Sequence, residues 1–308
     1  MKTSKHFLII SDDLTEKLNI VNKNFDFINY QEYKLSWTDN HLISNIQRIK
    51  SITNENGYTD DFNHNSLLLI DFELDFNETN YRLIRNKFYN CSQHFVDFEN
   101  SLSKFYKKSE FILTYDSSQY KAIYELIYSK EKKVSNTLLG EDGWESLSIL
   151  FTTLNNHCNW SIIRNFEGLN DNYHFQKEED VDIICDNMNL FIAISNANKR
   201  EEDLGHSSYS INIKDQKVFF DIREVGDKYF DPVWTINMLN NKKYKSFIPV
   251  LSDEDYFFSL LYHLKLQKFK IKKEYIKRLD LLAKKINLDL PNEFIHNDEI
   301  TSKLLNSF

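Results

Sequence analysis

Two short, β-prone runs with charged residues at alternating positions constrain the second half of this chain most strongly. The first run, Asp-Val-Asp-Ile-Ile-Cys, begins at Asp180 and contains Asp182, and the second, Val-Phe-Phe-Asp-Ile-Arg, begins at Val218. On a β-strand, residues two apart point to the same face. The two aspartates of the first run would therefore share a face, as would Asp221 and Arg223 of the second. Three carboxylates on neighbouring strands are what a divalent-metal site for phosphoryl transfer requires, so these runs are the first candidate site.

Glycine is too scarce in this chain to form the usual phosphate-binding loops. Only 6 of the 308 residues are glycine, and neither GxGxxG nor a GxxxxGKS or GxxxxGKT motif can be built from their positions. Rossmann dinucleotide sites, P-loop NTPases and protein kinases depend on such loops, because backbone N–H groups must approach the phosphates closely. The sequence therefore argues against all three classes.

The charge balance and the cysteines restrict the partners and the compartment. The net charge of −8 argues against a general nucleic-acid-binding surface, which is normally basic. The three cysteines lie far apart without zinc-site spacing, so we expect free thiols in a reducing compartment. The first residues lead into a run of only four apolar residues, too few for the core of a signal peptide, and no stretch approaches the ~18 apolar residues of a membrane span. We therefore expect a soluble, cytoplasmic protein.

In the first half of the chain, apolar runs alternate with segments of helical spacing. This alternation is typical of βαβ units, and it predicts an open, mostly parallel α/β sheet domain over residues 1–137. The expected strands are 7–10, 25–29, 67–72, 111–115 and a weak one near Val134, and the expected helices are 41–52, 81–106 and 120–128.

Acidic residues follow several of these expected strands, where ligands bind in open α/β sheets. One set loosely resembles the phosphoacceptor pattern of receiver domains, although no lysine closes a fifth strand. Its members are Asp12, Asp13, Asp71 and Thr114. A rival set of acids occupies alternating positions and consists of Asp71, Glu73 and Asp75. The alternative is that Asp71 ends a strand and its neighbours solvate the following turn.

The aspartate pair alone indicates little, because acid-x-acid patterns are common in a chain with 46 acidic residues. The order of the expected elements around the pair is more informative. A linker at 136–143 precedes a helix, a strand, a turn and the two acids. After the two acids come an apolar run that fits either a helix or a strand, then a further strand, and then the third acid. The expected elements are a helix at 144–154, strands at 160–164 and 209–213, and the ambiguous run at 190–194.

This order resembles the nucleotidyltransferase superfamily, whose fold is shared with DNA polymerase β. The family has a glycine-containing turn, a strand with two aspartates separated by one residue, and a third aspartate on a later strand. The matching positions are Gly168, Asp180, Asp182 and Asp221. The run Arg-Asn-Phe-Glu-Gly-Leu from Arg164, with Asp-Ile-Arg at 221–223 and Tyr-His at 262–263, resembles a divergent branch encoded among bacterial surface-polysaccharide genes. The resemblance covers about residues 143–270.

The resemblance implies a C-terminal domain over 143–308, with a mixed sheet and trailing helices. It also implies Mg²⁺-dependent transfer of a nucleotidyl or phosphoryl group from a nucleoside triphosphate, or another phosphate-bearing donor, to a hydroxyl acceptor. Two departures are evident. Glu167 precedes Gly168 where the family has Gly-Ser, so a triphosphate-holding hydroxyl is missing, and Glu179 stands where an apolar residue is usual. A degenerate, binding-only module is the alternative.

The physics of the site can be stated without the family. Two carboxylates about 5 Å apart repel by roughly 3 kcal/mol at an effective dielectric near 20, so Mg²⁺, an arginine or a proton must offset them. In a metal site, Asp180 and Asp182 would be ligands, and Asp221 would bind a second ion or act as base. Arg223 would neutralise phosphate. Otherwise, these acids pair with Arg223 or Arg164 in a structural ion network.

Trailing helices supply further candidates. Ser252 and Asp255 fit a helix-capping box at the start of a largely apolar helix that carries His263 and Lys268 as polar exceptions. His263 is either a satisfied interior group or part of the site. Lysines after residue 264 continue into a basic amphipathic helix, which is either a solvated face or a cationic wall for a nucleotide or polyanionic acceptor. Taken together, the predicted phosphate- or substrate-binding residues are Arg164, Gly168, Arg223, His263 and Lys268.

Overall fold

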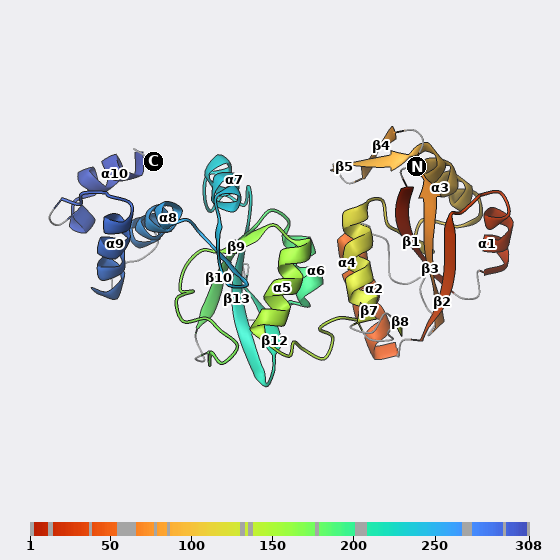
Figure 1. The fold of residues 1–308 in the computed structure, drawn as a ribbon, viewed down its shortest axis with the longest axis horizontal. Coiled ribbons are helices and arrows are strands. Elements are labelled where there is room, and N and C mark those ends of the chain that lie inside the picture. Colours follow the sequence, from red (N-terminus) through yellow and green to blue (C-terminus); the bar gives the residue numbers. More distant parts are fainter. Residues whose placement is uncertain are drawn as a thin grey trace. The chain divides into compact units, whose positions relative to one another are not determined.

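The computed structural model folds into two compact units of mixed α/β structure (Figure 1). One unit consists of Met1–Asp142 with Ile192–Asn196, and the other of Gly143–Phe191 with Ala197–Phe308. The structure describes residues 3–11, 15–36, 39–53, 66–76, 79–84, 87–129, 133–134, 138–175, 179–200, 208–266, 273–291 and 294–306.

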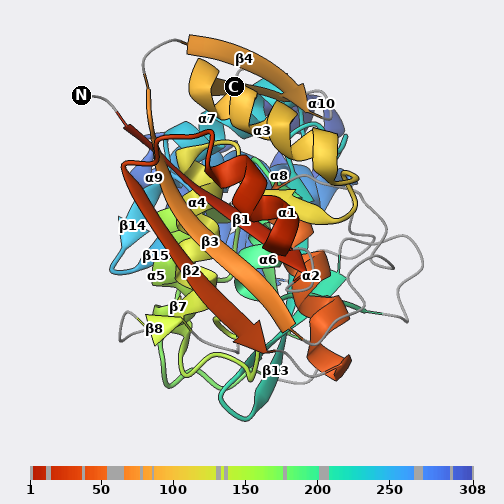
Figure 2. The same cartoon turned by 90° about the vertical axis from the view of Figure 1, so that its right-hand side faces the viewer.

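A four-stranded antiparallel sheet forms the centre of the first unit. Its order is β2 (Asn29–Ser36), β3 (Ser66–Asp75), β1 (Thr3–Ser11) and β6 (Phe111–Leu113), and the first three strands run side by side in Figure 2. Every neighbouring pair is antiparallel, so the predicted parallel sheet is wrong. The reason is that β1 and β2 do run in the same direction, but β3 lies between them and runs the opposite way.

Four helices of the described residues accompany this sheet: α1 (Thr15–Asn22), α2 (Asp39–Thr53), α3 (Gln93–Phe105) and α4 (Ser117–Ile127). The predicted helix over 81–106 is wrong in its first part, because β4 (Thr79–Ile84) and β5 (Lys87–Ser92) form an antiparallel hairpin there. Ser92 then caps α3 by accepting a hydrogen bond from the backbone N–H of Phe95 at 3.1 Å. Residues 25–28 precede β2 instead of forming a strand. A short hairpin of β7 (Tyr128–Ser129) and β8 (Lys133–Val134) follows α4.

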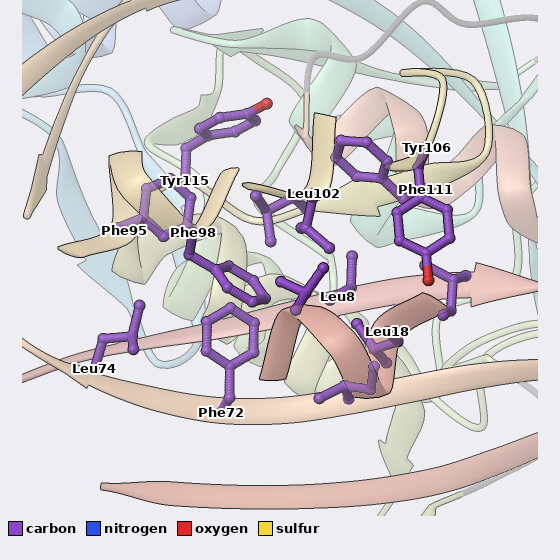
Figure 3. Packing of buried hydrophobic residues seen from close by; sticks show 14 of the residues in the cluster. Leu8, Leu18, Phe72, Leu74, Phe95, Phe98, Leu102, Tyr106, Phe111 and Tyr115 are labelled. Carbon is purple, nitrogen blue, oxygen red and sulfur yellow. The ribbon is translucent and has the colours of Figure 1, made fainter. Parts of the chain in front are cut away.

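The core of the first unit follows the two-residue period of its strands. Leu8 of β1 and Phe72 of β3 pack with α3 residues on one sheet face, where the Phe72 and Phe98 ring centroids lie 4.9 Å apart (Figure 3). Phe7, one residue from Leu8, points to the opposite face and stacks on Tyr120 of α4 at 4.4 Å. The sheet is therefore buried on both faces, as its continuous apolar runs predict.

A seven-stranded mixed sheet forms the centre of the second unit. The central strands β10 and β13 are parallel, whereas β9 runs antiparallel to β10. In spatial order the strands are β11 (Asn198–Lys199), β12 (Ser208–Ile213), β13 (Gln216–Glu224), β10 (Asp180–Cys185), β9 (Trp160–Ile162), β15 (Ile248–Val250) and β14 (Lys243–Lys245).

The helices of the second unit surround and follow this sheet. In chain order they are α5 (Leu147–His157), α7 (Pro232–Asn240), α8 (Asp253–Leu266), α9 (Lys273–Lys285) and α10 (Asp298–Asn306), with a 3-10 turn at Phe294–His296. The helix α6 (Met188–Ser195) begins in this unit, and its residues from Ile192 on belong to the first. The apolar run at 190–194 is thus helical. The predicted N-cap at Ser252 is confirmed, because the Asp255 N–H donates to Ser252 Oγ at 3.0 Å. The Asp255 carboxylate accepts from the Ser252 hydroxyl at 2.6 Å, in place of the bond to the Ser252 N–H that a full capping box has. In the described parts of the chain, no helix combines the length and apolar character needed to cross a membrane.

Candidate functional site

Asp182 and Asp221 lie directly opposite each other on neighbouring strands. The parallel register of β10 and β13 pairs these two residues, and it pairs Asp180 with Phe219. Because side chains at paired positions point to the same face, the two carboxylates share one surface of the sheet. Asp182 is buried and Asp180 is exposed, so the first of the three acids lies at the solvent end of β10.

Arg164 forms a buried ion pair with Asp182. Its Nη2 donates to Asp182 Oδ1 at 2.6 Å, and each side chain is 7% exposed. Arg164 follows the end of β9, where the Ile163 N–H donates to the Asp182 carbonyl at 2.9 Å and keeps the two segments in register. This is one of the two pairings expected of a structural ion network.

Arg223 forms the other expected pairing, with Asp221. Its Nη2 donates to Asp221 Oδ2 at 3.2 Å, and the guanidinium lies 4.2 Å from the ring centroid of Tyr229. Tyr229 comes from the turn after β13, where its N–H donates to Asp227 Oδ1 at 2.8 Å. Sequence reasoning missed Tyr229, and only the aromatic-rich character of residues 229–234 indicated it.

Three polar atoms of this cluster are buried without a hydrogen-bond partner among the described residues. They are Asp221 Oδ1, Arg164 Nη1 and Arg223 Nε. A buried polar atom without a partner costs free energy, so a polar group that reached the unpaired acceptor or either unpaired donor would stabilise the cluster. The acceptor suits a cation or hydroxyl, and the guanidinium N–H groups suit an anion.

The electrostatics of Asp182 reflect its crowded position. Burial raises the pKa of Asp182 to about 6, and the Asp180 and Asp221 carboxylates add to the increase while Arg164 opposes it. Nearby positive charge therefore stabilises the ionised form of this acid pair, and Arg164 and Arg223 supply part of that charge.

The described residues fit Mg²⁺ only as a partial ligand set. They include all three predicted aspartates, and within them no group of three or more His, Cys, Asp or Glu side chains is arranged to hold a metal ion. Mg²⁺ is commonly bound by one or two carboxylates together with substrate phosphates and water. The Asp182–Asp221 pair, with the unpaired Asp221 Oδ1, suits an ion that arrives with a phosphate ligand.

The turn after Arg164 connects this cluster with the C-terminal helices. Asn165 adopts a positive φ of 62°, and Glu167 Oε1 accepts a hydrogen bond from the Tyr256 hydroxyl at 2.9 Å. A Cβ added to Gly168 would meet Tyr173 Cε2 at 3.3 Å, so this glycine packs closely against an aromatic ring. The structure therefore gives Gly168 a local packing role, whatever it contributes to a ligand.

The remaining predicted residues lie elsewhere. His263 is buried on α8, in keeping with the apolar neighbours that the sequence gives it, and Lys268 lies outside the described residues. Arg278 of α9, which the sequence analysis did not single out, reaches back to Asn165 Oδ1 at 2.9 Å.

Of the receiver-like set, the described residues Asp71 and Thr114 belong to or follow strands of an antiparallel sheet, rather than lying at the carboxyl ends of parallel strands. Asp12 and Asp13 lie outside the described residues. Asp71 is level with Phe7, four residues or about 13 Å along β1 from Ser11. Both Asp71 carboxylate oxygens accept from the Tyr120 hydroxyl at 3.2 Å, and Thr114 Oγ1 accepts from the Phe7 N–H at 2.8 Å. These contacts are typical of residues that stabilise a sheet.

Comparisons with known proteins found no relative of this chain. No protein-family model matches the chain, and neither the curated proteins nor the solved structures contain a match.

Proposed function

We propose that the second unit binds a phosphate-bearing donor, such as a nucleoside triphosphate, and transfers its nucleotidyl or phosphoryl group to a hydroxyl acceptor with Mg²⁺. The observation that carries this proposal is the pairing of Asp182 with Asp221 across parallel strands, each carboxylate held by an arginine. Two acids and two arginines on one sheet surface match the chemistry of a metal–phosphate complex, which presents a cation and anionic oxygens together.

Each residue has a distinct part in this proposal. Asp182 and Asp221 would hold the ion, with Asp180 as a third carboxylate at the solvent end of the strand. Mg²⁺ would neutralise charge on the phosphates and align the attacking and leaving oxygens. Arg164 Nη1 and Arg223 Nε, which lack partners among the described residues, would donate to phosphate oxygens. The unpaired Asp221 Oδ1 would accept the proton of an acceptor hydroxyl or bind a second ion.

A second candidate is a binding module without catalysis. It is favoured by the Arg164–Asp182 contact, because an oxygen at 2.6 Å from a buried guanidinium is already strongly bound. The presence of Glu167 beside Gly168 also favours it, since Glu167 accepts from Tyr256 and supplies no hydroxyl for a triphosphate. In this case the arginines replace the metal as the source of positive charge.

Isothermal titration separates the two candidates. The wild-type chain is titrated with each nucleoside triphosphate, with and without Mg²⁺, beside Asp182→Asn and Asp221→Asn. The transferase proposal predicts Mg²⁺-dependent binding that either substitution weakens at least tenfold. Asp215→Asn, in the exposed turn between β12 and β13, is the matched control and should bind like the wild type.

Two outcomes count against transfer. Binding that is equal with and without Mg²⁺, and unchanged in both variants, favours the binding module. If the wild-type chain binds no nucleoside triphosphate with or without Mg²⁺, the proposal of nucleotidyl transfer from these donors fails.

A further inference from the structure

The second unit contains a pocket that is lined by residues other than the acid cluster. It lies among β14, β15, the start of α8 and one side of α9, and the turn at Phe166 and Glu167 completes its wall. Its volume is about 540 Å³, which lies within the range of small-molecule sites.

The pocket is positively charged within an acidic protein. Five basic side chains line it against three acidic ones, Glu167, Asp253 and Glu274, so it has an excess of two positive charges, whereas the chain carries −8. The basic residues are Lys243, Lys245, Lys277, Arg278 and Lys285. A local excess of this sign favours anions.

The arrangement of the ion pairs concentrates this excess. Lys243 Nζ lies 3.5 Å from Asp253 Oδ2, and Lys285 Nζ lies 3.3 Å from Asp253 Oδ1. One carboxylate is thus shared between two ammonium groups. Lys245 lies over the Phe166 ring, with its Nζ 4.5 Å from the ring centroid, which holds a further cation at the pocket wall.

Arg278 is held in a defined position at the same wall. Its Nη1 donates to Asn165 Oδ1 at 2.9 Å and to the Tyr256 hydroxyl at 3.1 Å, while its Nε lies 3.5 Å from Glu167 Oε1. Because several contacts orient the guanidinium, little side-chain entropy remains to be lost when it binds an anion.

Two large apolar side chains in the pocket are unusually exposed. Tyr244 is 55% exposed and Leu281 is 62% exposed, and both line the same cavity as the cations. A small inorganic anion would leave them in water. An organic anion would cover them and contact the lysines at once, with a gain from the apolar area removed from water.

We infer that this pocket binds an organic phosphate, that is, a small molecule with a phosphate ester and a carbon skeleton that covers Tyr244 and Leu281. The inference goes beyond the proposed transfer, because it depends on the α9 and β14 residues and needs neither Mg²⁺ nor the Asp182–Asp221 pair. The same chemistry is offered by a sugar phosphate and by a nucleoside monophosphate, so both serve as probes.

The test is calorimetric titration of the full chain, without Mg²⁺, using glucose 1-phosphate, AMP, glucose, adenosine and inorganic phosphate. We expect at least one phosphate ester to bind at least tenfold more tightly than both its neutral parent and inorganic phosphate. Lys277→Glu should weaken that binding at least tenfold. Lys284→Glu, on the same helix and also exposed but outside the pocket lining, is the matched control and should have no comparable effect.

Leu281→Ser tests the apolar part separately. It should weaken binding of the ester while leaving inorganic phosphate unaffected, and because Leu281 is exposed the substitution removes no side chain from the core. Equal weakening by Lys277→Glu and Lys284→Glu, or no binding of either ester, would overturn the inference. If Asp182→Asn still binds the ester, the site is separate from the acid cluster. If Asp182→Asn loses ester binding while Lys277→Glu retains it, the ligand belongs to the acid cluster instead.

Discussion

Arg164 Nη2 lies 2.6 Å from Asp182 Oδ1, and both side chains are almost completely buried. Removing one partner of such a pair leaves an uncompensated charge in the interior, at a cost of about 3–5 kcal/mol. We expect Arg164→Met to lower the free energy of unfolding by about 3 kcal/mol in urea titrations at pH 7.5. Adding Asp182→Asn to Arg164→Met should recover part of this loss, because the stranded carboxylate is gone. Additive effects in the double variant would show that the two side chains are not coupled.

The raised pKa of Asp182 predicts a specific pH dependence. Its pKa is about 6 in the folded chain against an ordinary value of 3.8, so the folded state holds this proton more tightly. The stabilisation from this proton is complete below about pH 4 and is lost as the pH rises through 6, with an effect on the order of 3 kcal/mol. We expect the Asp182→Asn variant to lack this decline in pH-dependent urea unfolding, whereas Asp215→Asn should retain it. Parallel profiles for wild type and Asp182→Asn would contradict the prediction.

The buried His6 leads us to expect a pH dependence of stability with the opposite sign. Burial lowers the pKa of His6 to about 4, although its Nδ1 donates to the Thr114 carbonyl at 2.9 Å, and its ring stacks on Phe95 at 4.2 Å. The stability from the neutral ring is complete above about pH 6.5 and is lost as the pH falls towards 4, by about 3 kcal/mol. His6→Asn should show a flatter profile between pH 7 and 4.5 in thermal unfolding. The exposed His174→Asn serves as control, and an equally flat profile there would show that the effect is not specific to His6.

Gly143 and Gly226 form a natural pair for separating backbone strain from steric contact. Both have positive φ, 95° and 88°, but a Cβ at Gly143 would lie 3.2 Å from the Asn212 carbonyl oxygen, whereas one at Gly226 would meet nothing within 4 Å. Alanine at either position costs about 1 kcal/mol of strain or more. We expect Gly143→Ala to be the more destabilising in urea unfolding, because it also disturbs the Trp144 N–H bond to the Asn212 carbonyl at 2.8 Å. Equal losses of unfolding free energy in the two variants would mean that the backbone around Gly143 shifts to relieve the contact at no energetic cost.

Much of the local structure could be predicted because it depends on neighbours in the sequence. The strand at Asp180, the N-cap at Ser252 and the helix at Pro232 follow from alternation, side-chain capping and a fixed proline φ. The errors fall in the first unit. The hairpin at residues 79–92 has apolar residues at spacings that also fit a helix, and nothing local indicates that β3 lies between β1 and β2.

For the candidate site, the sequence by itself determined that Asp180 and Asp182 share one face of a strand and that Asp221 and Arg223 share a face of another, because side chains alternate along any extended chain. Only the tertiary structure decided that Asp182 stands level with Asp221 and that Arg164 neutralises it. The register of parallel strands depends on a crossover connection and on packing across the sheet, which residue spacing does not encode. The choice between a metal and an arginine as the source of positive charge is likewise made by contacts between segments far apart in the chain.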